Sequence, residues 1–340
     1  MRFTTLSPTA LSLLSILSLV ACVPDEGREP SRTTKTCDAD DTNVETIEED
    51  LVIKTPADLD DLPTKCWDLR GKLTLQGTNI ISLEKLNKLV GMDELEIVGT
   101  KLTKLDTKLY VYETVTITGN DVLADLDQLE VDQNIAVDVT VDDNLALIDL
   151  GGLADLDKVS GDLTISRNAK LPSLAMRQLD EVGGTTRIAT NAAMTSIDLG
   201  RLDTVHRFEL IDNVALTTFG GFPARSIIGD LTVRGNKALT SLGTMSSLET
   251  IQGNLTIDNN SALTTVGLFT STMKYLTGVL AITNNAQLTD LGQLSHLTGI
   301  GAITINTNTK LPFCKAQEIQ HCVPQHGSVS ILNNQPNSPT

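Results

Sequence analysis

Acidic side chains beside a second acid or a base are the residues of this sequence that could do chemistry. Such pairs hydrolyse or eliminate across glycosidic bonds when they face each other on neighbouring elements. Glu209 with Arg187 is the nearest candidate pair, and Asp142 with Asp143 is a second one. Neither pair has a third partner in the repeat register described below, so a polysaccharide-active enzyme is only an alternative hypothesis.

No other catalytic or metal-binding set can be assembled from the sequence. The histidines are His206, His296, His321 and His326. Their spacing does not match metal ligands, and they complete no Ser-His-Asp or Cys-His set. No glycine-rich stretch continues into Gly-Lys-Ser or Gly-Lys-Thr, as a nucleotide loop would. We therefore expect no catalysis, no metal and no cofactor.

The charge balance disfavours one class of partner. The chain has 43 Asp and Glu against 26 Lys and Arg, a formal net charge of -17. This field repels phosphate, so nucleic-acid binding is not expected. Aromatic residues make up 3% of the chain, with one Trp, which leaves few stacking platforms for sugars or bases. A binding surface should therefore work mainly through polar, aliphatic and backbone groups.

A repeat positions all of these residues, and an Asn marks its register. Thirteen positions, which we call the marks, share this register at spacings of 20 to 26 residues. They are Pro56, Thr78, Thr100, Asn120, Asn144, Asn168, Asn191, Asn213, Asn236, Asn260, Asn285, Asn308 and Asn334. The third residue before each mark is apolar in every copy, and so is the fifth, except at Thr186. Seven before the mark, eight copies have Gly: Gly71, Gly161, Gly184, Gly229, Gly253, Gly278, Gly301 and Gly327.

Each copy of the repeat predicts one short strand. Leu255, Thr256 and Ile257 alternate apolar, polar and apolar, which is typical of a strand with one buried face. After Asn260 the apolar residues recur every third position, so the chain turns and directs a second set inward. One copy cannot bury both sets alone, but stacked copies can. We predict an all-β parallel solenoid of about 13 rungs of ~23 residues, roughly 58 Å long at the usual strand spacing.

The Asn at the mark and the Gly seven residues before it are expected to serve the scaffold. An Asn at a bend can bond neighbouring backbone groups, and amides stacked in register can form a ladder. A row of Asn side chains that grips a ligand is the functional alternative. We interpret Gly as a turn residue, needed where a side chain would clash or where φ is positive.

Threonines dominate the exposed centre of the predicted strands, four residues before the mark. The candidate binding face is Thr140, Thr164, Thr232, Thr256 and Thr304. Strand propensity alone could explain these threonines, but a flat polar stripe could also dock a ligand or a partner strand. An ice-binding surface needs a second Thr column, and the outward position six before the mark is mixed.

The register I-x-G-x-L-x-I-x-x-N-x-x-L-x-x-L resembles that of receptor L-domains. Motifs such as Gly229-Asp-Leu-Thr-Val-Arg-Gly-Asn236 and Gly253-Asn-Leu-Thr-Ile-Asp-Asn-Asn260 carry this resemblance over about residues 44–334. It is closer than the resemblance to leucine-rich repeats, whose apolar positions fall elsewhere around the Asn. The resemblance implies a right-handed β-helix that binds ligands on a cell surface. The chain shows no kinase segment, so receptor signalling does not carry over.

The first 22 residues resemble the signal peptide of a bacterial lipoprotein. Arg2 precedes an apolar run, Leu11 to Val20, that is too short to span a bilayer. Leu19-Val20-Ala21-Cys22 resembles a lipobox, in which Cys22 becomes the lipidated first residue. A plain secretory signal that contains a Cys is the alternative. By the same resemblance, Val23 at the second position of the mature chain implies sorting to the outer membrane. The lipid on Cys22 would hold the protein on the membrane, and the chain itself would not cross it.

The remaining cysteines are expected to close the two ends of the solenoid. They are Cys37, Cys66, Cys314 and Cys322. An exported chain can form disulfides, and the spacings do not suit a zinc site. Cys66 and Cys314 would lie about 48 Å apart, whereas a disulfide needs α-carbons within about 7 Å. We therefore predict the pairs Cys37–Cys66 and Cys314–Cys322, the latter only if a helix over 313–322 breaks before its end.

The expected organisation is a signal peptide (1–22), a flexible tether (23–36), one solenoid with disulfide-clamped caps (37–335) and a polar tail (336–340). Residues 37–65 contain ten acids and two lysines, which we interpret as a solvated cap because no calcium-loop spacing occurs. Two stacked L-domain units are the alternative, because the pattern weakens at Thr186 and His206.

These features predict an exported, lipid-anchored protein of the bacterial cell envelope that binds a protein or glycan through an elongated surface. A structural envelope component that self-associates is the alternative.

Overall fold

A computed structural model of the chain describes residues 44–269 and 273–336. All of these residues lie within one compact unit, Thr36–Thr340. The predicted signal peptide with Cys22, the tether, Cys37 and residues 337–340 of the tail lie outside the described residues, so these predictions remain untested.

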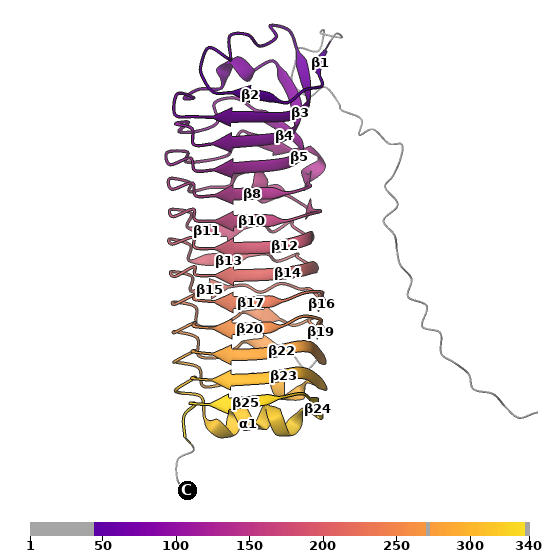
Figure 1. Cartoon of the computed structure of the whole chain (residues 1–340), viewed down its shortest axis with the longest axis vertical. Coiled ribbons are helices and arrows are strands. Elements are labelled where there is room, and N and C mark those ends of the chain that lie inside the picture. The colour runs from indigo at the N-terminus through magenta and orange to yellow at the C-terminus, as the bar shows by residue number, and fades with distance from the viewer. Residues whose placement is uncertain (1–43, 270–272, 337–340) are drawn as a thin grey trace, which may run out of the picture. The chain divides into compact units, whose positions relative to one another are not determined.

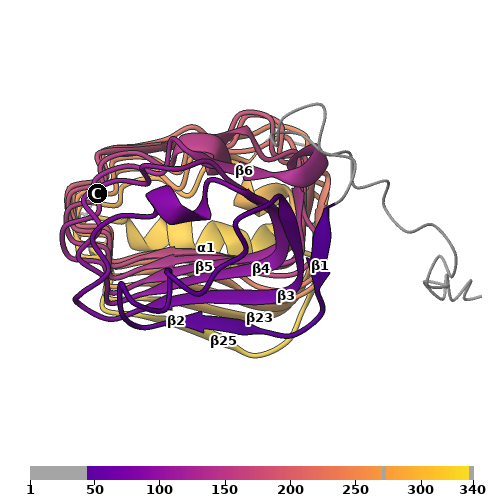
Figure 2. The same cartoon turned by 90° about the horizontal axis from the view of Figure 1, so that it is seen from above.

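The chain winds into about 12 stacked turns of ~23 residues, with 41% strand and 8% helix (Figure 1). Neighbouring turns pair in parallel throughout, for example Thr140 with Thr164 and Thr232 with Thr256. Seen from above, the chain runs clockwise as it moves away from the viewer, which makes the coil right-handed (Figure 2). The predicted β-solenoid is confirmed.

In the described residues, one 20-stranded sheet runs along the solenoid. Its long face consists of β2 (Leu51–Ile53), β3 (Trp67–Gln76), β4 (Leu89–Val98), β5 (Leu109–Thr118), β8 (Val139–Asp142), β10 (Leu163–Ser166), β12 (Glu181–Ala189), β14 (Thr204–Ile211), β17 (Leu231–Arg234), β20 (Leu255–Asp258), β22 (Tyr275–Thr283), β23 (Gly299–Asn306) and β25 (Val329–Leu332). Shorter strands extend it at one corner: β1 (Glu45–Ile47), β6 (Leu129–Val131), β7 (Ile135–Ala136), β9 (Lys158–Val159), β16 (Ser226–Ile227), β19 (Thr250–Ile251) and β24 (Gln325–His326).

Short strands and single turns of helix occur on the other side of most coils. Two small sheets contain β11 (Ser173–Ala175), β13 (Ser196–Asp198) and β15 (Thr218–Phe219), and β18 (Thr244–Met245) with β21 (Leu268–Phe269). The 3-10 turns are η1 (Glu84–Leu86), η2 (Asp132–Asn134), η3 (Gly151–Asp155) and η4 (Leu294–His296), and the α-helix is α1 (Phe313–Cys322). Most coils have no room for a longer helix.

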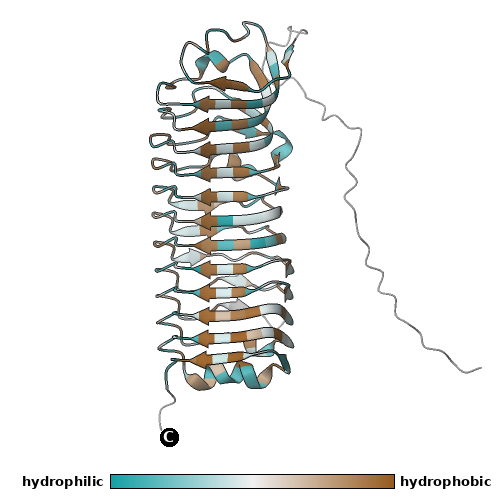
Figure 3. Cartoon of the chain, in the orientation of Figure 1, coloured by the Kyte–Doolittle hydropathy of each residue, from teal (hydrophilic) through white to brown (hydrophobic). Residues whose placement is uncertain are grey.

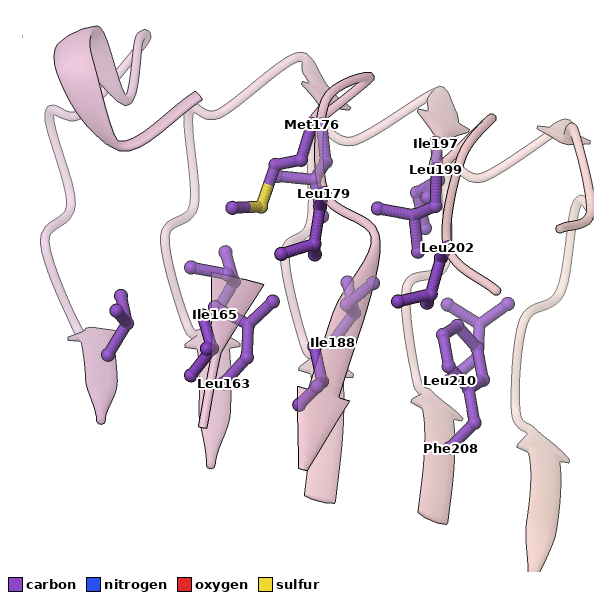
Figure 4. Packing of buried hydrophobic residues seen from close by; sticks show 14 of the residues in the cluster. Leu163, Ile165, Met176, Leu179, Ile188, Ile197, Leu199, Leu202, Phe208 and Leu210 are labelled. Atoms are coloured by element: carbon purple, nitrogen blue, oxygen red, sulfur yellow. The ribbon is translucent and has the colours of Figure 1, made fainter. Parts of the chain in front are cut away.

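The apolar positions of the repeat form one core. Its members run without a break from Ile53 in β2 to Val323 after α1. Side chains of the long face, such as Ile165 and Ile188, point toward side chains of the opposite wall, such as Met176 and Leu202 (Figure 4). The alternation along each strand lines up from coil to coil (Figure 3). Each fully buried Leu or Ile contributes about 1.5–3 kcal/mol, so stacking, and not any single turn, stabilises the fold.

The marked asparagines form a buried ladder. The backbone N–H of each Asn from Asn120 to Asn308 donates to Oδ1 of the Asn in the next coil, as Asn236 does to Asn260 at 3.0 Å. Each Nδ2 in turn donates to a backbone carbonyl of the preceding coil, as Asn236 does to Leu210 at 2.9 Å. All ten Asn side chains are buried. This confirms the scaffold role and leaves no surface for a ligand.

The residue before the mark has positive φ in every coil from the second mark onward. Gly, Asn and Asp occupy most of these places, but Arg167, Thr190 and Thr307 also adopt φ of 55 to 60°. The left-handed conformation turns the chain so that the next residue, the Asn, points inward. Positive φ was one of the two reasons offered for the Gly seven before the mark, and none of these eight glycines adopts it.

In five of the eight copies the Gly seven before the mark makes room for an Asp or Asn side chain of the preceding coil, and at Gly229, Gly301 and Gly327 it makes room for a backbone carbonyl oxygen. A Cβ on Gly161 would lie 2.2 Å from Oδ1 of Asp138, and one on Gly184 would lie 2.2 Å from Oδ1 of Asp162. Asp138 uses that oxygen to accept the backbone N–H of Asp162 at 2.7 Å. The other half of the prediction, that a side chain would clash here, is confirmed.

Helix α1 closes the C-terminal end, with Ala316 and Ile319 buried against the core. It runs unbroken to Cys322, and eight residues of helix separate its ends by about 12 Å. Cys314 and Cys322 are both exposed and the structure forms no bond between them, so the predicted C-terminal disulfide is wrong. Cys66 is buried, and because Cys37 lies outside the described residues, the N-terminal pair stays a prediction.

Candidate functional site

The long sheet presents one continuous outer face, which is the candidate site. Its central column consists of the side chains four before the marks, which pair directly from strand to strand. In order they are Val52, Thr74, Glu96, Thr116, Thr140, Thr164, Arg187, Glu209, Thr232, Thr256, Ala281, Thr304 and Ser330.

The five predicted threonines all stand in this column and are partly exposed, but they do not form one unbroken row. Thr140 pairs with Thr164, and Thr232 pairs with Thr256. Arg187 and Glu209 separate these two pairs, and Ala281 separates the second pair from Thr304. The column therefore contains three short hydroxyl patches, Thr116 to Thr164, Thr232 with Thr256, and Thr304 with Ser330, and a charged pair between the first two.

An ion pair occupies the centre of the face. Arg187 and Glu209 pair in register on β12 and β14, and Nη1 of Arg187 donates to Oε2 of Glu209. The exposed fractions of the two side chains are 41% and 22%. The guanidinium group of Arg187 thus neutralises the carboxylate of Glu209.

The second acidic candidate is also engaged by its neighbours. Asp142 in β8 accepts a hydrogen bond from Ser166 Oγ at 2.5 Å and one from Arg167 Nη2. Asp143 occupies the left-handed corner position before Asn144, with φ of 57°. The structure therefore does not combine Asp142 and Asp143 into a site with a third group.

A flanking column six before the marks binds backbone. Asp138 and Asp162 accept an N–H from the following coil, and so do Asp230 and Asn254, at 2.6 to 2.8 Å. These oxygens fasten adjacent coils together, so the mixed composition of this column has a structural cause. The sequence signal for this bond, not recognised from the sequence alone, is the Gly seven before the next mark, since Gly161 leaves room for Oδ1 of Asp138 and Gly184 for Oδ1 of Asp162.

The four histidines lie on four separate elements. His206 is in β14, His296 in η4, His321 in α1 and His326 in β24. Among the residues that the structure describes, no group of three or more His, Cys, Asp or Glu could hold a metal ion.

An open depression at one corner of the solenoid was missed by sequence analysis. It has a volume of about 520 Å³ and is lined by nine residues of β22, β23 and the turn into β24, among them Tyr275, Gly299, Gln325 and His326. A smaller hollow of about 160 Å³ lies near the N-terminal cap beside Leu59 and Ile81. The signal for the first was a Gly in a column of larger side chains, which becomes visible only once the strands are aligned.

Comparisons of the chain with protein-family models, with curated proteins and with solved structures give no match. In the described part of the chain, no helix combines the length and apolarity needed to cross a membrane.

Proposed function

We propose that this chain is an exported, lipid-anchored protein of the bacterial cell envelope that binds a ligand through its solenoid surface and performs no catalysis. The observation that carries the proposal is the outer face of the long sheet, where polar side chains stand in register over about 12 turns while Asp142 and Glu209 are paired with arginines. The resemblance to receptor L-domains supports a binding role. Because fold does not fix function, the ligand must be found by experiment.

Attachment to the membrane is tested on the mature protein. We expect its mass to show cleavage before Cys22 and acylation of that residue, and we expect Cys22→Ala to move the protein out of the membrane fraction. Three acyl chains exceed the two signals needed for stable anchoring. Cys322→Ala is the matched control and should stay in the membrane. An unmodified Cys22 in the mature chain would refute the anchor.

Ligand binding is tested with glycan and protein arrays and with lysine variants of the outer face. Thr232→Lys combined with Thr256→Lys places two long charged side chains on one hydroxyl patch, and a ligand docked there should bind at least ten times more weakly. Thr240→Lys is the control, because Thr240 is exposed on another wall of the solenoid. Equal binding by all variants would remove this face from the proposal.

The absence of catalysis is tested with acidic polysaccharides. We expect no turnover above buffer. Turnover that disappears in Glu209→Ala would overturn this part of the proposal and favour the enzyme alternative.

Self-association is a second candidate function, favoured by the open edge of β25. In each coil the residues five and one before the mark donate their N–H groups to the next coil, as Ile303 does to Ser328 and Thr307 to Leu332, both at 2.9 Å. The equivalent groups of Val329 and Asn333 meet no further strand in the described residues. Such an edge can pair with another chain.

Sedimentation of the purified protein tests this alternative. If the edge joins two chains, Leu332→Lys should shift the population toward monomer, because Leu332 lies in β25 with 59% of its surface exposed. Leu145→Lys changes an exposed Leu in the middle of the solenoid and should have no effect. A wild-type monomer at all concentrations would exclude self-association.

A further inference from the structure

The depression at the corner of β22, β23 and β24 is a gap in a column of side chains. Thr250 pairs with Tyr275, Tyr275 with Gly299, and Gly299 with Gln325. The column therefore has side chains on both sides of Gly299 and none at it. We call this gap the Tyr275–Gln325 notch.

The backbone does not require Gly at the floor of the notch. Gly299 does not have positive φ, and a Cβ there would lie 3.8 Å from Cδ1 of Tyr275 and 3.9 Å from Oε1 of Gln325, both ordinary contact distances. The neighbouring Gly301 differs, because its Cβ would lie 2.4 Å from the carbonyl oxygen of Thr277. Gly301 thus serves the fold, whereas Gly299 leaves space between two flanking groups.

The walls of the notch offer one aromatic ring and a hydrogen-bonding amide. Half of the surface of Tyr275 is exposed, and among the side chains that the structure describes no other aromatic is exposed. Gln325 supplies an amide that can both donate and accept. His326 also lines the notch, but it pairs with the buried Ile300 and so belongs to the neighbouring column of the strand, which faces away from Tyr275 and Gln325.

The backbone at the floor offers no strand edge to a peptide. Gly299 pairs with Tyr275 on one side and with Gln325 on the other. Recognition at the floor of the notch must therefore come from the flanking side chains. A ring stacked on Tyr275 with hydroxyl groups at its edge satisfies this requirement.

Charge selects between neutral and ionic ligands. The lining contains no Asp, Glu, Lys or Arg, and the chain as a whole has a formal net charge of -17, which repels anions. Resting on the binding function proposed above, we propose that the Tyr275–Gln325 notch binds a sugar ring of a neutral glycan, with the ring stacked on Tyr275 and its hydroxyl groups bonded to the amide of Gln325.

Binding of a panel of neutral hexaoses, made from glucose, mannose or galactose units, to the purified full chain tests this inference. We expect saturable binding of at least one of them, weakened at least tenfold by Tyr275→Ala, which removes the stacking ring, and by Gly299→Val, which fills the gap. Thr204→Ala is the control, because Thr204 stands in the same column several coils away and should bind as the wild type does. If Gly299→Val does not fold, Gln325→Ala replaces it, because the change removes an exposed amide.

The outcomes separate this inference from the function on which it rests. Neutral glycan binding that neither Tyr275→Ala nor the notch variant weakens would overturn the notch and leave the binding function standing. Binding of acidic glycans only, or of a protein at the outer face only, would do the same. A chain that binds no ligand on any array would overturn both.

Discussion

Thr186 places a hydroxyl group at a position, five before the mark, where the other copies of the repeat have an apolar residue. It is fully buried between Leu163 and Phe208 in the register of the long sheet, and its Oγ1 has no hydrogen-bond partner among the described residues. Phe208 packs with Phe219 and Phe222, with ring centroids 5.7 and 5.1 Å apart. The short side chain of Thr186 thus lies beside the bulkiest residue at this position of the repeat. The departure from the pattern at Thr186 compensates for the large side chain of Phe208 in the next coil. The strands on both sides of Thr186 still pair with each other.

Thr186→Val should therefore stabilise the protein. Val has nearly the same shape and removes a buried hydroxyl without a partner, which should raise the free energy of unfolding by about 1–2 kcal/mol. Denaturant unfolding measures the change. Thr256→Val, on the exposed face, is the control and should change it by less than about 0.5 kcal/mol. A destabilised Thr186→Val would mean that the hydroxyl has a partner, such as a buried water.

Tyr110 makes stability depend on alkaline pH. Burial, together with the hydrogen bond that its hydroxyl donates to Asp132 at 2.5 Å, raises the pKa of Tyr110 well above its usual 10.0. Because the folded state holds the proton more tightly, this contribution is complete below pH 10 and is lost as pH rises above it. Unfolding measured from pH 8 to 11 should show a steeper alkaline loss in the wild type than in Tyr110→Phe. Equal slopes would contradict the assignment.

At the scale of the elements, each strand is fixed by contacts from the coil before it. The Gly seven before the mark and the side-chain oxygen six before the mark work together, since the Gly of one coil leaves space for the oxygen that holds the next strand. The alternation of Leu255, Thr256 and Ile257 was enough to predict a strand. The side-chain oxygen that accepts an N–H group of the strand was not predictable, because it belongs to a residue more than twenty positions earlier in the chain.

Gly253→Ala tests this coupling between coils. The new Cβ would lie 2.5 Å from Oδ1 of Asp230 and from the carbonyl oxygen of Gly229, and since backbone cannot move aside cheaply, the variant should lose about 1–3 kcal/mol of stability. Gly220→Ala is the matched control, because its Cβ would meet only the carbonyl oxygen of Ile197 at 3.5 Å. Thermal or denaturant unfolding should separate the two variants. Equal stability of the two variants would contradict the proposed coupling between adjacent coils.

At the scale of the whole molecule, the Asn ladder ties the coils into one unit. A solenoid is stabilised by contacts between neighbouring repeats, and the ladder adds a line of buried hydrogen bonds from Asn120 to Asn334. Breaking the line in the middle should therefore cost more than breaking it at its end.

Asn213→Ala and Asn334→Ala test this expectation. The first removes the acceptor of two hydrogen bonds from Asn191 and the donor to the carbonyl oxygens of Ile188 and Ile211, and should lower the free energy of unfolding by about 3–5 kcal/mol. The second lies in the last coil with 9% of its surface exposed, where water can replace part of the loss, so a smaller decrease is expected. Equal losses in denaturant unfolding would argue against a position-dependent ladder.

The sequence by itself determined the repeat, the strand in each copy, the inward apolar positions and the structural role of the marked Asn. These follow from local period and side-chain chemistry, which any one copy of the repeat contains. The tertiary structure alone decided the rest: the continuous helix that keeps Cys314 from Cys322, the arginines that neutralise Asp142 and Glu209, and the notch beside Tyr275. Each depends on which residues of different coils stand next to each other, and stacking sets that adjacency through coil lengths that vary from one copy to the next.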